Sequence, residues 1–218
     1  MAREVPFNDE THAKLLEAAG EVFAEKGFHG STIREICNLA GTNVASVNYH
    51  FGDKLALYAE VLKIAVNAAE TGAWRAQDDS VPPEESLKMF IRFMFRNFQR
   101  PDKLGWHLKL LMHEMAQPTP AFADVINEVI RPNFRKLSGI VSRITGFPAN
   151  DDRTRMCVFS IMGQIIFYVH GRIVLGGLWP EMKMNEERME QISSHIVEFT
   201  LCSLRALPKE STRSRKHK

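Results

Sequence analysis

Cysteine is scarce in this chain of 218 residues, and its three copies, Cys37, Cys157 and Cys202, stand far apart. The count is odd, and no pair has the short spacing of a zinc-binding knuckle. We therefore expect no disulfide framework and interpret the pattern as that of a protein from the reducing cytoplasm. All three thiols are expected to act as small apolar side chains of the core.

Long uninterrupted apolar runs are also missing. The N-terminus, MAREVPFNDE, has no apolar signal region. Residues 158–179 contain no acid, but they include Gln164, His170 and Arg172, which are costly in lipid. A helix buried against other helices explains this stretch better than a membrane span, so we expect no membrane association.

Signatures of catalysis and of metal binding are absent as well. The sequence has no nucleophile elbow, no phosphate-cradling glycine loop and no credible pair of catalytic carboxylates. His107 and His113 are six positions apart, which does not place them on one helical face, and no H-E-x-x-H motif is present. We expect no enzymatic activity, no metal and no cofactor.

Helical periodicity runs through almost the whole chain, and no stretch alternates with the period of a strand. The fold is predicted to be all-α. Proline, glycine and acidic residues at 71–83 are typical of a linker between short N-terminal helices and longer apolar ones. We predict an N-terminal domain at 8–68, a larger C-terminal domain at 80–208, and a basic disordered tail at 209–218.

Two N-terminal helices have clear boundaries. Thr32 and Glu35 have the spacing of a capping box, which starts a helix, and Gly41 ends it. A second short helix is predicted from about Asn43 to Phe51. On that helix Val47 is expected to face the preceding helices, together with Phe51, whereas the opposite side is short, polar and aromatic.

Three short helices with a glycine turn between the second and the third have the pattern of a helix-turn-helix. Small residues would let the last helix enter a major groove. Asn48 could read an adenine edge, and Ser46 and Tyr49 could bond base edges or phosphates. Arg34 and Lys54 would supply positive charge from the neighbouring helices.

The stretch TIREICNLAGTNVASVNYHFGDK at 32–54 resembles the DNA-binding domain of the TetR family of repressors, and AAGEVFAEKGF at 18–28 resembles the first helix of that family. The likeness covers roughly residues 8–68. The remainder, with EMAQPTPAF at 114–122, VIRPNF at 129–134 and GQIIFY at 163–168, resembles the C-terminal domain of CecR-type regulators.

The resemblance implies an all-helical homodimer that binds a double-stranded DNA operator and releases it when a small-molecule effector binds. Val44 departs from the Lys of many members, and Asn48 departs from the commoner Tyr, so the resemblance does not predict the operator sequence. The predicted DNA-contacting residues are Thr32, Arg34, Asn43, Val44, Ala45, Ser46, Asn48, Tyr49, His50 and Lys54.

Phenylalanine and methionine are plentiful in the C-terminal region, as expected for a core. They also suit a pocket for a hydrophobic or aromatic effector. The predicted ligand-binding residues are Phe90, Phe93, Met94, Trp106, Leu110, Met115, Phe122, Phe159, Met162, Phe167 and His170. His170 could instead have a structural role.

The dimer interface is expected on two predicted helices, Arg153–Leu175 and Asn185–Leu204, with Gly163 and Gly171 allowing close approach. Two alternatives to a regulator remain open. Residues 1–55 carry five Lys or Arg against eight Asp or Glu, which leaves room for a small-molecule binding protein with a vestigial helix-turn-helix. An enzyme with an all-helical pocket is the other alternative.

Overall fold

The computed structural model describes residues 7–68, 80–97 and 101–207, and within these ranges it contains helices and no strand. The all-α prediction is confirmed. The chain divides into two compact units. Unit 1 comprises residues 1–69 and 100–131, and unit 2 comprises residues 70–99 and 132–218. The predicted tail at 209–218 and most of the predicted linker lie outside the described residues.

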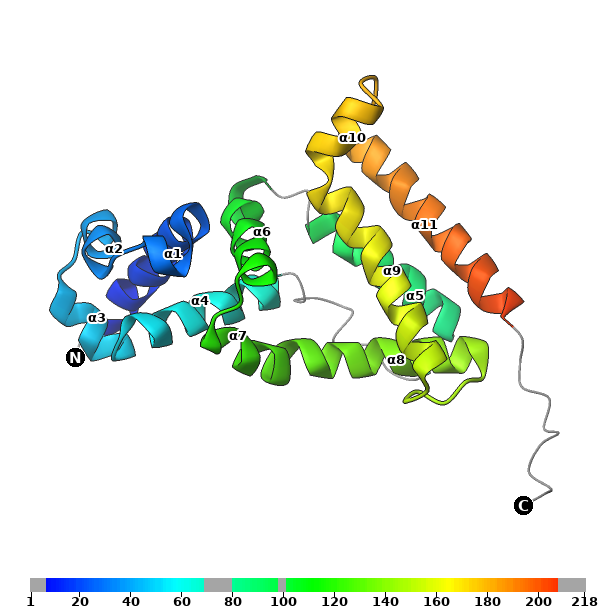
Figure 1. Cartoon of the computed structure of the whole chain (residues 1–218), viewed down its shortest axis with the longest axis horizontal. Coiled ribbons are helices and arrows are strands. Elements are labelled where there is room, and N and C mark those ends of the chain that lie inside the picture. The colour runs from blue at the N-terminus through cyan, green and yellow to red at the C-terminus, as the bar shows by residue number, and fades with distance from the viewer. Residues whose placement is uncertain (1–6, 69–79, 98–100, 208–218) are drawn as a thin grey trace, which may run out of the picture. The chain divides into compact units, whose positions relative to one another are not determined.

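The α-helices of both units are labelled in Figure 1. Those of unit 1 are α1 (Phe7–Gly30), α2 (Ile33–Ala40), α3 (Val44–Phe51), α4 (Lys54–Ala68), α6 (Pro101–Ala116), α7 (Pro120–Val125) and the π-helix η1 (Ile126–Ile130). Those of unit 2 are α5 (Pro83–Asn97), α8 (Arg131–Thr145), α9 (Asp152–His170), α10 (Arg172–Leu178) and α11 (Glu186–Ala206).

One apolar core holds unit 1 together. Fully buried side chains come from α1, α2, α3, α4 and α6, with Phe23, Ile36, Val47, Leu62 and Leu110 among them. The core therefore fixes the three short helices against α4 and α6. The extent of unit 1 differs from the predicted domain limits of 8–68 and 80–208, because α6, α7 and η1 pack with the N-terminal helices.

The lack of a side chain at Gly20 allows α6 to lie close to α1. A Cβ atom added to Gly20 would stand 2.6 Å from ring atoms of Trp106, so only glycine leaves room for the indole there. The indole nitrogen of Trp106 also donates to the carboxylate of Glu17 at 3.4 Å. Further along α6, the ring of His113 donates to the carbonyl of Ala24 at 3.1 Å, just before α1 leaves helical geometry at Gly27.

Unit 2 is built around an amphipathic α9. Its buried residues Thr154, Val158, Ile161, Ile165 and Val169 recur at helical spacing and face the interior. α11 carries a similar buried row and packs on α5 and α9. The guanidinium of Arg205 on α11 pairs with Glu84 on α5. None of the described helices is long and apolar enough to cross a membrane.

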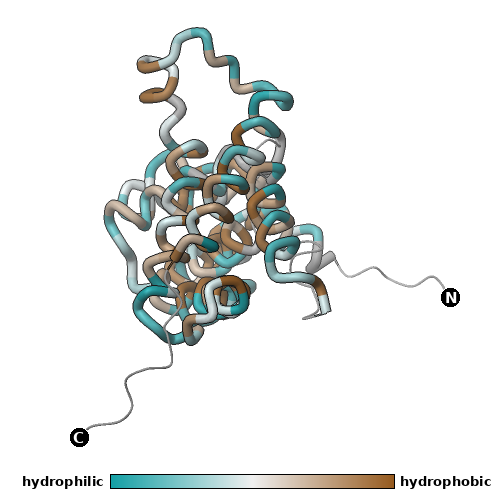
Figure 2. Tube along the Cα trace, turned by 90° about the vertical axis from the view of Figure 1, so that its right-hand side faces the viewer, coloured by the Kyte–Doolittle hydropathy of each residue, from teal (hydrophilic) through white to brown (hydrophobic). Residues whose placement is uncertain are grey.

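The prediction of one continuous helix over Arg153–Leu175 is wrong in one respect, because the helix breaks at Gly171 into α9 and α10. A Cβ atom at Gly171 would stand 2.5 Å from the carbonyl oxygen of Phe167. Gly171 therefore permits this corner within its own chain. α10 exposes apolar side chains, with Ile173 at 92% and Leu178 at 77%, and brown segments lie near the top of Figure 2, where this helix is.

Candidate nucleic-acid interface

The start of α2 is fixed by the predicted capping box. The hydroxyl of Thr32 accepts the backbone N–H of Glu35 at 3.2 Å, and the Glu35 carboxylate accepts the backbone N–H of Thr32 at 2.9 Å. Lys26 lies 2.6 Å from the same carboxylate. The hydrogen bonds from Lys26 and then Thr32 lower the pKa of Glu35. Thr32 is among the residues predicted to contact DNA, and in the structure its hydroxyl caps the helix.

The turn into α3 is also built from short-range bonds. Gly41 adopts the left-handed conformation at φ 65°, which favours glycine. Asn43 is the N-cap of α3, and its side-chain oxygen accepts the backbone N–H of Ser46 at 3.1 Å. The hydroxyl of Thr42 donates to that of Ser46 at 2.9 Å. Asn43 and Ser46 are therefore already engaged in starting the helix.

α3 has two distinct faces. Val47 is fully buried in the core and Phe51 is half-buried, as the helical spacing predicts. On the other side Tyr49 is 76% exposed and Ala45 is exposed, and Val44, 44% exposed, and Asn48 lie between the two faces and are exposed as well. An exposed helix face of two small apolar residues, an amide and a phenol has the size and chemistry to enter a DNA groove.

Lys54 has a structural contact that the sequence did not suggest. Its ammonium donates to the carbonyl oxygens of Phe28 and Ser31, each at 2.5 Å, and lies 4.6 Å from the centre of the Phe28 ring. Burial lowers the pKa of Lys54. The side chain therefore ties the start of α4 to the end of α1. Arg34 and Lys54 are the two Lys or Arg residues predicted to contact DNA, and of these Arg34 on α2 has the exposed side chain.

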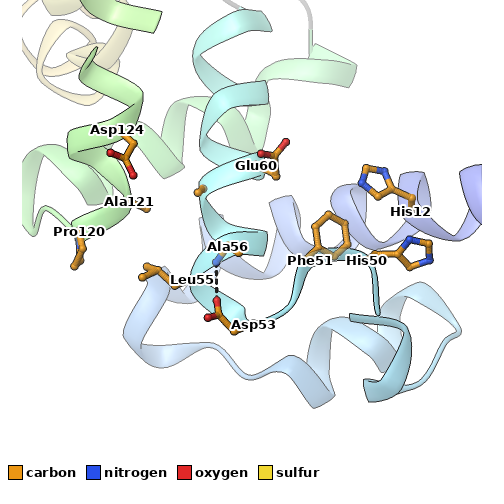
Figure 3. A pocket seen from close by; sticks show the side chains of 11 residues that line it. His12, His50, Phe51, Asp53, Leu55, Ala56, Glu60, Pro120, Ala121 and Asp124 are labelled. Carbon is orange, nitrogen blue, oxygen red and sulfur yellow. Dashed lines mark hydrogen bonds between the residues drawn. The ribbon is translucent and has the colours of Figure 1, made fainter. Parts of the chain in front are cut away.

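His50 is half-buried at the end of α3, in the wall of a hollow of about 530 Å³ (Figure 3). Its ring meets that of His12 edge-on at 5.6 Å, and the His12 ring stacks on Phe51 at 4.7 Å. Asp53 caps α4 by accepting the backbone N–H of Ala56 at 2.8 Å, the dashed line in Figure 3. His50 thus anchors the C-terminal end of α3 to α1 through aromatic contacts.

The predicted ligand-binding residues fall into two groups. In unit 1, Leu110 is fully buried, Trp106 and Phe122 pack on the same core, and Met115 is 61% exposed. The structure therefore uses three of these four side chains to build the core that carries the helix-turn-helix.

The remaining predicted ligand-binding residues belong to unit 2. On α5 lie Phe90, Phe93 and Met94, and on α9 lie Phe159, Met162, Phe167 and His170. Phe90 and Met94 are buried, whereas Phe159 and Phe167 are exposed. Burial lowers the pKa of His170, which favours its neutral form.

Glu114 has a structural role that the sequence did not suggest. Its carboxylate accepts the hydroxyl of Tyr58 and the backbone N–H of Thr119. Within the described residues no group of three or more His, Cys, Asp or Glu side chains is placed to hold a metal. A single acid among apolar neighbours was the one signal of this contact in the sequence.

Comparison with known proteins matches both parts of the chain. Residues 15–61 match the domain of bacterial regulatory proteins of the TetR family. Residues 83–207 match the C-terminal domain of the HTH-type transcriptional dual regulator CecR.

Two curated relatives are regulators of transcription. The dual regulator CecR of Shigella flexneri is 27% identical over 201 residues, which cover 86% of this chain and 88% of the relative. The transcriptional activator FasR of Mycolicibacterium smegmatis is 27% identical over 154 residues, which cover 71% of this chain and 68% of FasR.

Solved structures share the fold at low sequence identity. The fatty acid degradation regulator FadR from Bacillus halodurans has a TM-score of 0.66 at 18% identity, covering 89% of this chain and 96% of its own. AibR, solved with isovaleryl coenzyme A and operator DNA, has a TM-score of 0.65 at 20% identity, covering 87% and 97%.

The capped helix-turn-helix of unit 1 and the matches along the chain define a transcriptional regulator, and not an enzyme. More narrowly, the chain belongs to the TetR family and carries a C-terminal domain of the CecR type.

Proposed function

We propose that this regulator is a homodimeric repressor, which binds a palindromic operator through α3 and leaves it when a small hydrophobic or aromatic effector binds. The observation that supports operator binding is the exposed face of α3, with Val44, Ala45, Asn48 and Tyr49 on the outside and Val47 in the core. We infer a cytoplasmic location, where such a protein meets DNA.

Dimerisation follows from the size of the reading surface. One short helix reaches few base pairs, whereas two helices related by a twofold axis read a palindrome. Exposed apolar side chains on unit 2 support a dimer contact, with Met156 and Phe167 on α9 and Phe199 on α11. Gly163 lies on the same exposed side of α9, and a Cβ there would meet no atom within 4 Å. A second copy of the chain would bury this face.

The effector is proposed to bind in unit 2 near the aromatic and methionine side chains of α5 and α9. Phe90 and Met94 are buried there, and Met162 and His170 are half-buried. Because burial lowers the pKa of His170, this residue is better suited to a neutral hydrogen bond than to an ion pair with an acidic ligand. AibR, solved with isovaleryl coenzyme A, makes an acyl chain a reasonable first effector to test.

Fluorescence anisotropy with duplex DNA from upstream of the protein's own gene tests the proposal. A specific regulator should prefer this DNA over random duplex by at least about 1,000-fold at fixed salt. A hydrophobic effector should then lower the anisotropy by releasing the DNA.

Equal binding to the upstream and the random duplex, and to genomic fragments selected in the same assay, would contradict the proposal. That result would favour the alternative of a small-molecule binding protein with a vestigial helix-turn-helix. The acidic excess of residues 1–55 supports that alternative.

A further inference from the structure

The exposed face of α3 has a chemistry that limits which bases it can read. The helix sequence VASVNYHF contains no Lys, Arg, Asp or Glu. Arg and Lys are the side chains that bond guanine O6 and N7, and Asp and Glu are those that accept from the amino group of cytosine. α3 therefore lacks the usual side chains for reading either base of a G·C pair.

The polar side chains of α3 are not equally available. Ser46 is bonded to Thr42, and its backbone N–H is capped by Asn43. His50 is half-buried against His12 and Phe51. Two asparagines offer an amide at this helix. Asn43 forms the N-cap, whereas Asn48 is exposed and takes no part in the cap. An asparagine bonds adenine N6 and N7 with its own oxygen and nitrogen.

The apolar side chains of this face complete the pattern. Val44 and Ala45 are exposed in the first turn, and methyl groups of this kind contact the C5-methyl group of thymine. Val44 and Asn48 are four positions apart and lie on the same side of the helix. The rise between them is about 6 Å, which corresponds to about two base steps of 3.4 Å in DNA.

We propose that α3 selects A·T pairs in each operator half-site. Asn48 reads an adenine, and Val44 and Ala45 contact thymine methyl groups about two base pairs away. Tyr49, 76% exposed, packs its ring beside these bases and directs its hydroxyl to the DNA. This inference rests on the proposed operator binding and adds the class of bases that the operator presents.

In vitro selection with the full-length chain and a duplex library of random central sequence yields the operator without any assumption about its bases. The selected duplex is then synthesised with 7-deazaadenine in place of adenine, which removes N7, or with uracil in place of thymine, which removes the methyl group. Affinities of these duplexes are measured by anisotropy for the wild type and for Asn48→Ala, Val44→Ala and Arg34→Ala.

Selected half-sites should carry an adenine and neighbouring thymines. Replacing that adenine by 7-deazaadenine should weaken wild-type binding about 5-fold or more, and should leave Asn48→Ala unaffected. Uracil should weaken wild-type binding about fourfold for each methyl group lost, and less so for Val44→Ala. Arg34 is proposed to contact a phosphate, so Arg34→Ala should weaken binding to all duplexes by the same factor.

Two different failures are separable. Selected half-sites with G·C pairs at the enriched positions, or equal sensitivity of the wild type and Asn48→Ala to 7-deazaadenine, would overturn the A·T reading and leave operator binding intact. A library that yields no enriched sequence would overturn the proposed operator binding itself, and the A·T reading with it.

Discussion

The hydroxyl of Tyr58 on α4 donates a hydrogen bond of 2.6 Å to the carboxylate of Glu114 on α6, and both side chains are buried. The other oxygen of Glu114 accepts the backbone N–H of Thr119 at 2.8 Å. Burial and the bond to Glu114 raise the pKa of Tyr58, so its hydroxyl keeps its proton. A buried carboxylate needs such donors because its lost hydration is costly. The pair therefore holds α4, the helix that follows α3, to α6.

Replacing Tyr58 by Phe should lower the free energy of unfolding by about 1–3 kcal/mol, because a buried carboxylate oxygen loses its donor. Urea unfolding followed by circular dichroism measures the change. Tyr49→Phe is the matched control, since that side chain is exposed, and its effect should stay within about 0.5 kcal/mol. Equal stability of Tyr58→Phe and the wild type would show that the bond contributes nothing.

Gly163→Leu should weaken the proposed dimer, because a large side chain on the exposed face of α9 would keep a second copy from approaching. Light scattering at several concentrations measures the mass. Gly139→Leu on α8 is the control, because a Cβ at either glycine meets no atom within 4 Å. If both variants keep the mass of the wild type, this face of α9 is not the dimer contact.

The N-terminus of α9 should respond to acid through Asp151. Its carboxylate accepts from the side chain and the backbone of Arg153, and these bonds lower its pKa from 3.8 to about 2. Because the folded-state pKa is depressed, the stabilisation is complete above about pH 4 and is lost as the pH falls towards 2.

Asp151→Asn keeps a capping oxygen but loses the charge. The urea midpoints of this variant and the wild type should therefore differ at about pH 6 and converge as the pH approaches about 2. A difference that stays constant over this range would mean that the charge of Asp151 is not responsible for it.

Salt dependence of operator binding reports the number of phosphate contacts. The part of the chain that carries the helix-turn-helix is acidic overall, so we expect a moderate slope of log affinity against log salt. Arg34→Ala should reduce that slope by about 1, as expected for one lost phosphate contact. Lys88→Ala on α5, in unit 2, should leave it unchanged. An unaltered slope for Arg34→Ala would show that Arg34 does not contact a phosphate.

Sequence reasoning succeeded where neighbours in the chain determine the structure. The capping box of Thr32 and Glu35, the left-handed Gly41 and the burial of Val47 each depend on spacings of a few residues. Local bonds of this kind leave a readable pattern, because side chain and backbone lie in the same turn.

It failed where contacts span long stretches of the chain. Lys54 bonds carbonyls more than 20 positions away, and nothing in the spacing predicts them. A helical stripe shows that Leu110 is buried, but not that it belongs to the core of unit 1.

The most direct test of the central claim is the affinity of the selected operator for the double variant Asn48→Ala/Tyr49→Ala, measured by anisotropy beside the wild type. Both replaced side chains are exposed, so the fold should survive, which circular dichroism checks. We predict that operator affinity falls at least about tenfold, since each good base contact contributes about 1–3 kcal/mol, while affinity for random duplex changes little. Operator binding as tight as that of the wild type would contradict the account, because α3 would then not be the surface that reads the DNA.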